Sequence, residues 1–147
     1  LFPVLIGRLY PGLRARGGGL GILSDDPRRE IVAHLRRAHL QQHFAFIGTS
    51  ERYAPKPSPA GVRAFLRHTG LKPRAVIMVG DLADDIRAGR AARVRTAAYL
   101  GGWQTPAVLG RSRPDFIIRR LDQLPDLVGG SAAHKKSAAT SGGWALG

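Results

Sequence analysis

Three acidic residues lie within five positions of a chain that is otherwise poor in acids. Asp81, Asp84 and Asp85 follow an apolar run at residues 76–79, and the 147-residue sequence holds 10 acids against 23 lysines and arginines. Hard divalent cations, Mg²⁺ above all, prefer oxygen ligands of this kind. Acids at a helix start also favour the helix dipole, but three such residues exceed what a helix start needs. We therefore predict that Asp81 and Asp85, one helical turn apart, bind a metal ion.

A lysine and a serine are placed in two other loops where they could bind phosphate. Lys56 lies between two prolines in a chain that almost always uses arginine. An ammonium there can neutralise a phosphate, whereas the alternative is a solvated side chain. Ser24 and Asp25 end an apolar run and precede a helical segment. The hydroxyl and the free N–H groups of that helix could hold a phosphate oxygen, although Ser-Asp pairs are also common helix caps.

The segments that would position these loops alternate between strand and helix patterns, which is typical of βα units in an α/β domain. We expect strands at residues 20–23, 44–48, 75–79, 96–100 and 115–118, and helices at 4–16, 28–39, 59–69, 82–92 and 121–128. Residues 24–27 supply capping side chains and then a proline for the first turn of the second helix. All three loops follow strands, which is where ligand sites lie in parallel α/β sheets.

Composition limits the class of protein. The 44% hydrophobic content is enough for one domain with a core over residues 1–128, and the composition of residues 129–147 indicates a disordered tail. The absence of cysteine excludes disulfides and thiolate metal sites. No apolar run is long enough to cross a membrane and the start does not resemble a secretory signal, so we expect a soluble cytoplasmic protein without a membrane partner. Because the first residue is Leu1 and the one methionine is Met78, we expect an excerpt, a processed product or a misread start.

The formal net charge of +13 raises the question of nucleic-acid binding. The arginines are scattered and are not interleaved with exposed aromatic residues, so arginine-rich solvated helix faces are the favoured interpretation. A nucleic-acid partner is therefore the less favoured alternative.

The ordered set of loops resembles the haloacid dehalogenase superfamily, in particular its phosphoglycolate-phosphatase-like members. Residues 20–25 are similar to its second motif, a strand ending in serine or threonine. Residues 56–59 are similar to the third motif and residues 80–92 to the fourth, in the same order and at similar spacing. Residues 3–16 resemble the helix that enters the second motif. The resemblance covers residues 3–128 and implies a Rossmann-like three-layer α/β sandwich with a mainly parallel sheet.

This resemblance also implies a reaction, namely Mg²⁺-dependent phosphoryl transfer from a small phosphorylated molecule through an aspartyl-phosphate. Ser24 and Asp25 would bind the phosphate. Lys56 would bind both the phosphate and the carboxylate of the nucleophile. Asp81 would be a metal ligand with a catalytic role, and Asp85 would support the metal and its waters.

Two parts of the family pattern are missing from this sequence. One is the first motif, an apolar strand ending in Asp-x-Asp that supplies the nucleophile and the general acid/base; the other is the cap domain that follows it. In the family this strand lies in mid-sheet, between the strands of the second and fourth motifs, so its absence would leave unpaired backbone groups. Arg93 also stands where the family usually has glycine. We expect either a natural protein that is longer at its N-terminus or a repacked chain that has lost the chemistry.

Three functions stay open, in order of preference. They are a phosphatase core, a non-catalytic relative that binds a phosphorylated ligand or a partner, and a basic nucleic-acid-associated module. We expect the sequence as given not to hydrolyse phosphate esters by the family mechanism, because it holds no nucleophile. The missing strand also leaves completion by a partner strand, and hence a homo-oligomer, as an open alternative.

Overall fold

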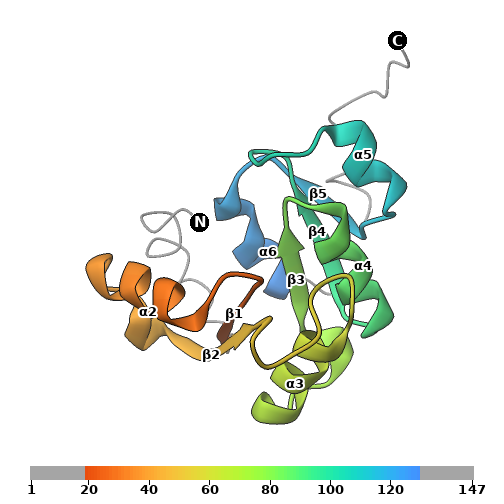
Figure 1. Ribbon diagram of the computed structural model, residues 1–147. Helices are drawn as coiled ribbons and strands as arrows, with labels where there is room; N and C mark the ends of the chain where they lie inside the picture. Colours follow the sequence, from red (N-terminus) through yellow and green to blue (C-terminus); the bar gives the residue numbers. More distant parts are fainter. Residues whose placement is uncertain (1–18, 130–147) are drawn as a thin grey trace.

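Strands and helices alternate along the chain, as the sequence predicts (Figure 1). The computed structural model describes residues 19–129, so the helix expected at residues 4–16 and the tail beyond residue 129 lie outside the described part. The elements are β1 (Leu20–Ser24), α2 (Arg28–Arg37), β2 (Phe44–Thr49), α3 (Ala60–Thr69), β3 (Ile77–Gly80), α4 (Ala83–Ala91), β4 (Arg95–Tyr99), α5 (Pro106–Arg111), β5 (Phe116–Ile118) and α6 (Leu124–Gly129). Short 3₁₀ turns at Gln41–His43, Pro73–Ala75 and Leu121–Gln123 precede β2, β3 and α6.

The strands form two parallel sheets rather than one. β1 pairs with β2 in a two-stranded sheet, and β3, β4 and β5 pair in that order in a three-stranded sheet. Within residues 19–129, β1 and β3 each have a hydrogen-bonded neighbour on one side only. The break between the sheets therefore falls between the strands of the second and fourth motifs, where the resemblance implied an absent strand.

Helices cover both faces of the strands, which confirms the expected three layers (Figure 1). Neighbouring residues of β4 show the two faces, because Ala97 packs in a cluster with Leu124 of α6 and Ala98 packs with Ile86 of α4. On the α6 side, α2 covers β1 and β2 through Ile31 and its neighbours. The opposite face is covered by α3, α4 and α5.

Two helices join the separate sheets. On one face, Leu23 of β1 and Met78 of β3 pack in the same cluster as Val62 of α3. On the other face, Leu20 of β1 and Val79 of β3 pack in the cluster that includes α6. Side-chain packing against α3 and α6, rather than backbone pairing, therefore holds the two sheets together.

The predicted capping of α2 is wrong. Pro27 is the N-cap residue and contributes no side-chain hydrogen bond. The N–H of Arg28 instead donates to Glu51 Oε2 at 2.9 Å, from the loop after β2. The hydroxyl of Ser24 accepts from the N–H of Asp26 at 3.1 Å, so it closes its own tight turn before the helix begins.

One short helix, α5, was not expected from the sequence. It has six residues, with Pro106 in its first turn and Thr105 as the N-cap, whose hydroxyl accepts from the N–H of Val108 at 3.4 Å. A Thr-Pro pair is a usable start signal, but six residues are too few for a clear hydrophobic period. No helix within residues 19–129 is long and apolar enough to span a membrane.

Candidate functional site

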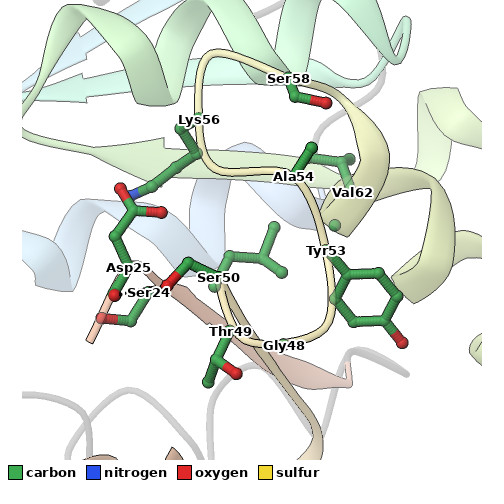
Figure 2. A pocket seen from close by; sticks show the side chains of 12 residues that line it. Ser24, Asp25, Gly48, Thr49, Ser50, Tyr53, Ala54, Lys56, Ser58 and Val62 are labelled. Carbon is green, nitrogen blue, oxygen red and sulfur yellow. Dashed lines mark hydrogen bonds between the residues drawn. The ribbon is translucent and has the colours of Figure 1, made fainter. Parts of the chain in front are cut away.

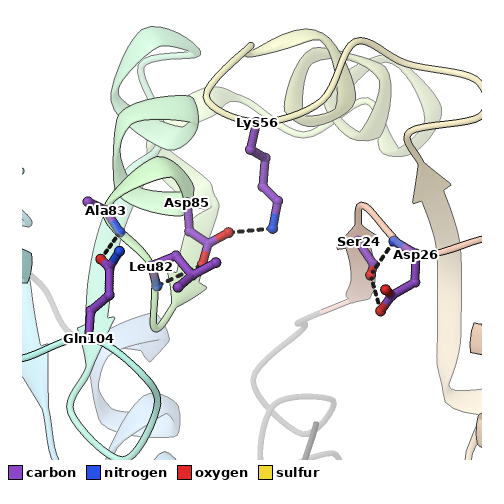
Figure 3. Close-up of polar contacts among 7 residues, drawn as sticks. All are labelled: Ser24, Asp26, Lys56, Leu82, Ala83, Asp85 and Gln104. Atoms are coloured by element: carbon purple, nitrogen blue, oxygen red, sulfur yellow. Dashed lines mark hydrogen bonds and ion pairs between the residues drawn. The ribbon is translucent and has the colours of Figure 1, made fainter.

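The three predicted loops meet at one edge of the strands. Ser24 and Lys56 line a small cavity of about 20 Å³. Lys56 also lines a second and larger space of about 430 Å³ together with Asp81 and Asp85; this space lies between β1 and β3 and is called the inter-sheet cleft below. Lys56 therefore lines both spaces, one at the end of β1 and the other at the end of β3 (Figures 2 and 3).

A buried ion pair fixes Lys56. Its Nζ donates to Asp85 Oδ1 at 2.5 Å, and the two side chains are only 16% and 6% exposed. The other carboxylate oxygen, Asp85 Oδ2, accepts from the N–H of Leu82 at 3.1 Å (Figure 3). Both oxygens of Asp85 are thus occupied, and Lys56 is not a solvated surface lysine.

Two glycines allow the backbone to approach the acids closely. A side chain at Gly80 would place its Cβ 2.2 Å from Asp85 Oδ2. A side chain at Gly102 would place its Cβ 2.1 Å from Asp81 Oδ2. These clashes explain why both positions are glycine, because any larger residue would displace a carboxylate of the site.

Asp81 is the acid that keeps a free oxygen. Its Oδ2 accepts from the N–H of Trp103 at 3.3 Å. Within residues 19–129, Oδ1 accepts no hydrogen bond, and the side chain is partly exposed to the inter-sheet cleft. Asp81 can therefore offer one carboxylate oxygen to a cation.

Asp84 belongs to the surface and not to the site. It forms an ion pair with Arg87 one turn further along α4 at 2.9 Å, and the two side chains are 47% and 60% exposed. Neighbouring positions on a helix point about 100° apart, which separates Asp84 from the inward-facing Asp85. The acidic cluster of the sequence is thus divided between the site and solvent.

The residues at the end of β1 are already engaged. Ser24 Oγ donates to Asp26 Oδ2 at 3.1 Å (Figure 3), and the carbonyl of Asp25 accepts from Ser50 Oγ at 2.7 Å. Figure 2 shows Ser24, Asp25 and Ser50 at the small cavity, whose 20 Å³ has room for about one water molecule. No hydrogen bond within the described part of the chain joins Ser24 to Lys56. A phosphate at this edge would therefore have to draw the Ser24 hydroxyl away from Asp26.

The donor set fits a magnesium ion only in part. Among residues 19–129, no group of three or more histidine or acidic side chains converges as a metal site. Mg²⁺ is, however, commonly held by one or two carboxylates together with water and substrate phosphate. Asp81 fits such a ligand, whereas Asp85 fits a supporting position because Lys56 and Leu82 occupy its oxygens.

A fourth loop at the same edge was missed in the sequence. The loop after β4 supplies Gln104, whose Oε1 accepts from the N–H of Ala83 at 2.6 Å and so caps the start of α4 (Figure 3). The same loop supplies the N–H of Trp103 to Asp81. The rule that loops after parallel strands line the site could have identified it, because this loop also follows a strand.

Arg95 lies at the amino end of β4, away from these loops. Burial lowers the pKa of the Arg95 guanidinium, and Asp115 offsets part of this effect. Arg95 donates to the carbonyl of Leu127 at 2.9 Å, which ties β4 to α6. Its role is therefore structural.

Residues 9–99 match the haloacid dehalogenase-like hydrolase family. The chain belongs to this family. It is 32% identical over 113 residues to the pyrophosphatase PpaX of Bacillus pumilus, covering 76% of this chain and 52% of that protein. It is 29% identical over 126 residues to phosphoglycolate phosphatase 1 of Pseudomonas aeruginosa, covering 80% and 46%. The chain thus spans about half the length of the curated relatives it matches.

Solved structures agree on the fold. A structure from Haemophilus somnus, described as a predicted phosphoglycolate phosphatase, aligns with a TM-score of 0.76 at 21% identity over 83% of this chain and 55% of its own. A haloacid dehalogenase-superfamily hydrolase from Geobacter sulfurreducens aligns with a TM-score of 0.64 at 25% identity, over 83% and 60%. The predicted superfamily, its phosphoglycolate-phosphatase-like branch and the α/β class are confirmed.

Proposed function

We propose that this chain is the core of a phosphatase that acts on a small phosphorylated molecule with Mg²⁺. The observation that carries the proposal is the buried Lys56–Asp85 pair beside Asp81, at the edge where three strand-following loops meet. A mostly buried ammonium attracts a phosphate more strongly than a solvated one, because less water screens it. The names of the relatives, a pyrophosphatase and a phosphoglycolate phosphatase, support the same class of reaction.

Phosphate binding is assigned to Ser24, Asp25 and Lys56. The Ser24 hydroxyl donates a hydrogen bond to Asp26 Oδ2. In the complex it would donate to a phosphate oxygen instead. The exposed carboxylate of Asp25 would repel a phosphate, so this residue would contribute its backbone N–H. The Lys56 ammonium would neutralise phosphate charge while Asp85 holds it in place.

Metal binding is assigned to Asp81, with Asp85 as the supporting residue. Mg²⁺, when bound, would neutralise charge on the phosphate. Asp81 Oδ1 would be the direct ligand, and the bond from Trp103 to Oδ2 orients that carboxylate. Asp85 keeps its bonds to Lys56 and Leu82 and would act on the metal through water.

The nucleophile is the part that this sequence does not supply. An aspartyl-phosphate requires a carboxylate that attacks phosphorus as the bond to the leaving oxygen breaks. The sequence contains no Asp-x-Asp segment after an apolar strand. We therefore propose that residues 1–147 bind phosphate and metal but do not turn over a substrate by themselves.

Calorimetry of Mg²⁺ binding to the full 147-residue chain tests the metal assignment. We expect saturable binding that is lost in Asp81→Asn and kept in Asp84→Asn, a matched control because Asp84 is exposed and paired with Arg87. Binding that survives in Asp81→Asn, or no binding in a folded chain, would overturn the assignment.

A turnover assay with p-nitrophenyl phosphate tests the proposed inactivity. We expect no turnover by residues 1–147. Robust turnover that disappears in Asp81→Asn would show that a nucleophile is present after all.

A further inference from the structure

Arginines that are scattered along the sequence are gathered by the fold at one edge of the three-stranded sheet. β3, β4 and β5 are parallel neighbours, so the turns that enter them lie side by side at the amino ends of the strands (Figure 1). These turns are residues 70–75 before β3, 90–95 before β4 and 110–115 before β5. They lie at the edge opposite to the candidate site, which is built at the carboxyl ends of the strands.

Each of the three turns carries exposed basic residues. We call the set the basic edge; it consists of Lys72, Arg74, Arg90, Arg93, Arg111 and Arg113. The one acid in the same turns is Asp115, and its charge compensates that of Arg95, which is partly buried beside it. The positive charges of the basic edge are therefore not balanced by acids of the same turns.

Local structure accounts for only one of these side chains. Basic residues near a helix end can bond the last carbonyls and favour the helix dipole. Arg90 does so, because its guanidinium donates to the carbonyl of Arg113 at 2.8 Å. Within residues 19–129, the side chains of the other five residues form no hydrogen bond or ion pair. They are free to bind a partner.

Two arginines of the basic edge occupy backbone positions that favour glycine. The angle φ is +62° at Arg93 and +57° at Arg113, in the left-handed region that a side chain disfavours. Helices commonly end on a glycine in this conformation, as α3 does at Gly70 with φ +68°. Glycine would therefore suit both turns better, and neither arginine side chain gains a bond within residues 19–129 that offsets the strain. This points to a role for the two side chains outside the fold.

The chemistry of the basic edge fits the phosphates of a nucleic-acid duplex. Arginine and lysine only donate hydrogen bonds, and phosphate oxygens only accept them. Neighbouring strands are about 4.8 Å apart, so the three turns form a row roughly 10 Å long. One strand of a DNA duplex advances about 3.4 Å along the axis for each phosphate, so the row covers about three phosphates.

Two other anionic partners fit the basic edge less well. Proteins that bind single strands stack the bases on aromatic side chains, and residues 70–75, 90–95 and 110–115 contain no phenylalanine, tyrosine or tryptophan. Binding to a membrane surface combines basic residues with an apolar face. The one large apolar side chain that is exposed in these turns is Leu71, which lines the inter-sheet cleft.

We propose that the basic edge binds the phosphate backbone of duplex DNA without regard to base sequence. This surface is separate from the candidate site, because the four or five residues of β3 and β4 place about 13–17 Å between the two edges of the sheet. The inference therefore does not depend on the proposed phosphatase function.

The test measures binding of the full 147-residue chain to a fluorescent DNA duplex of arbitrary sequence, by anisotropy at about 50 to 200 mM salt. The variant combines Arg93→Gly with Arg113→Gly, which removes two charges and the backbone strain at both positions. We expect binding that is about tenfold weaker or more. The slope of log K against log salt should become less steep by about 2, since each lost phosphate contact contributes about 0.9.

Two controls separate the basic edge from net charge and from folding. Arg29→Gln combined with Arg119→Gln removes two exposed charges that do not belong to the basic edge, and should leave the affinity within about twofold. Urea unfolding of the glycine variant should give an unchanged or higher midpoint, because glycine adopts positive φ without strain.

Several results would overturn the proposal. One is no binding of the duplex at about 50 mM salt, and another is an equal loss of affinity in the two double variants, which would assign binding to net charge alone. A lower urea midpoint in the glycine variant would show that the two arginines serve the fold. Tighter binding to an RNA duplex, or to anionic lipid vesicles with the same dependence on Arg93 and Arg113, would assign the basic edge to that partner instead.

Discussion

Replacing either member of the Lys56–Asp85 pair should destabilise the protein, and by unequal amounts. Breaking a buried ion pair typically costs about 3–5 kcal/mol, because the remaining charge is left without a partner. Asp85→Asn leaves the Lys56 side chain, which at 16% exposure can regain water through the cleft, and keeps an acceptor for Leu82. We expect a cost of about 2 kcal/mol, or a Tm lower by about 4–8 °C.

Lys56→Met should lower the free energy of unfolding further, by about 3 kcal/mol, because the Asp85 carboxylate that it leaves without a partner is only 6% exposed. The double variant removes both charges and keeps the apolar stem of the lysine. It should therefore be about 1–2 kcal/mol more stable than the sum of the two single costs predicts. Urea unfolding of the full chain, followed by circular dichroism, measures all four proteins.

Additive losses of unfolding free energy in the double variant would contradict this expectation. If the double variant equals the sum of the singles within about 0.5 kcal/mol, the two charges do not stabilise each other in solution. A larger loss of stability in Asp85→Asn than in Lys56→Met would show that burial of the remaining charge does not set the cost. Asp84→Asn serves as the control, because an exposed pair contributes less than about 1 kcal/mol.

Three further substitutions have expected outcomes in the same urea unfolding assay. Gly70→Ala should lower the free energy of unfolding by about 1–2 kcal/mol, because φ at this position is +68°. The added Cβ would meet nothing within 4 Å, so the loss would come from backbone strain alone, and an unchanged urea midpoint would contradict this. Thr96→Val should cost about 1–3 kcal/mol, since the 0% exposed hydroxyl exchanges hydrogen bonds with Asp115 at 3.1 Å, and a neutral effect would show that these bonds are dispensable. Trp103→Ala should change stability by less than about 0.5 kcal/mol because Trp103 is 90% exposed, so a larger loss would reveal a packing role.

The order of elements could be predicted from the sequence because its signals are local. The end of α3 at Gly70 needs only a residue that tolerates positive φ, and the structure has φ +68° there. The sequence likewise predicts that three loops share one edge of the sheet, because the carboxyl ends of parallel strands point in the same direction. Both features depend only on neighbouring residues in the sequence or on a general rule of sheet topology.

Contacts between distant segments could not be predicted in this way. Glu51 caps α2 from 23 positions away from Arg28, and Gln104 caps α4 from 21 positions away from Ala83. A glutamate or glutamine side chain carries no sign of which helix it will reach. The same holds for the pairing of Lys56 with Asp85 across 29 positions, which required the folded chain.

The break in the sheet and the chemistry at its edge are physically linked. Lys56, Asp81 and Asp85 line the inter-sheet cleft, so water that enters the cleft also reaches the ion pair. Water in the cleft screens the charges of Lys56 and Asp85, because the local dielectric rises with hydration. The backbone break between β1 and β3 therefore weakens the ion pair that carries the candidate site.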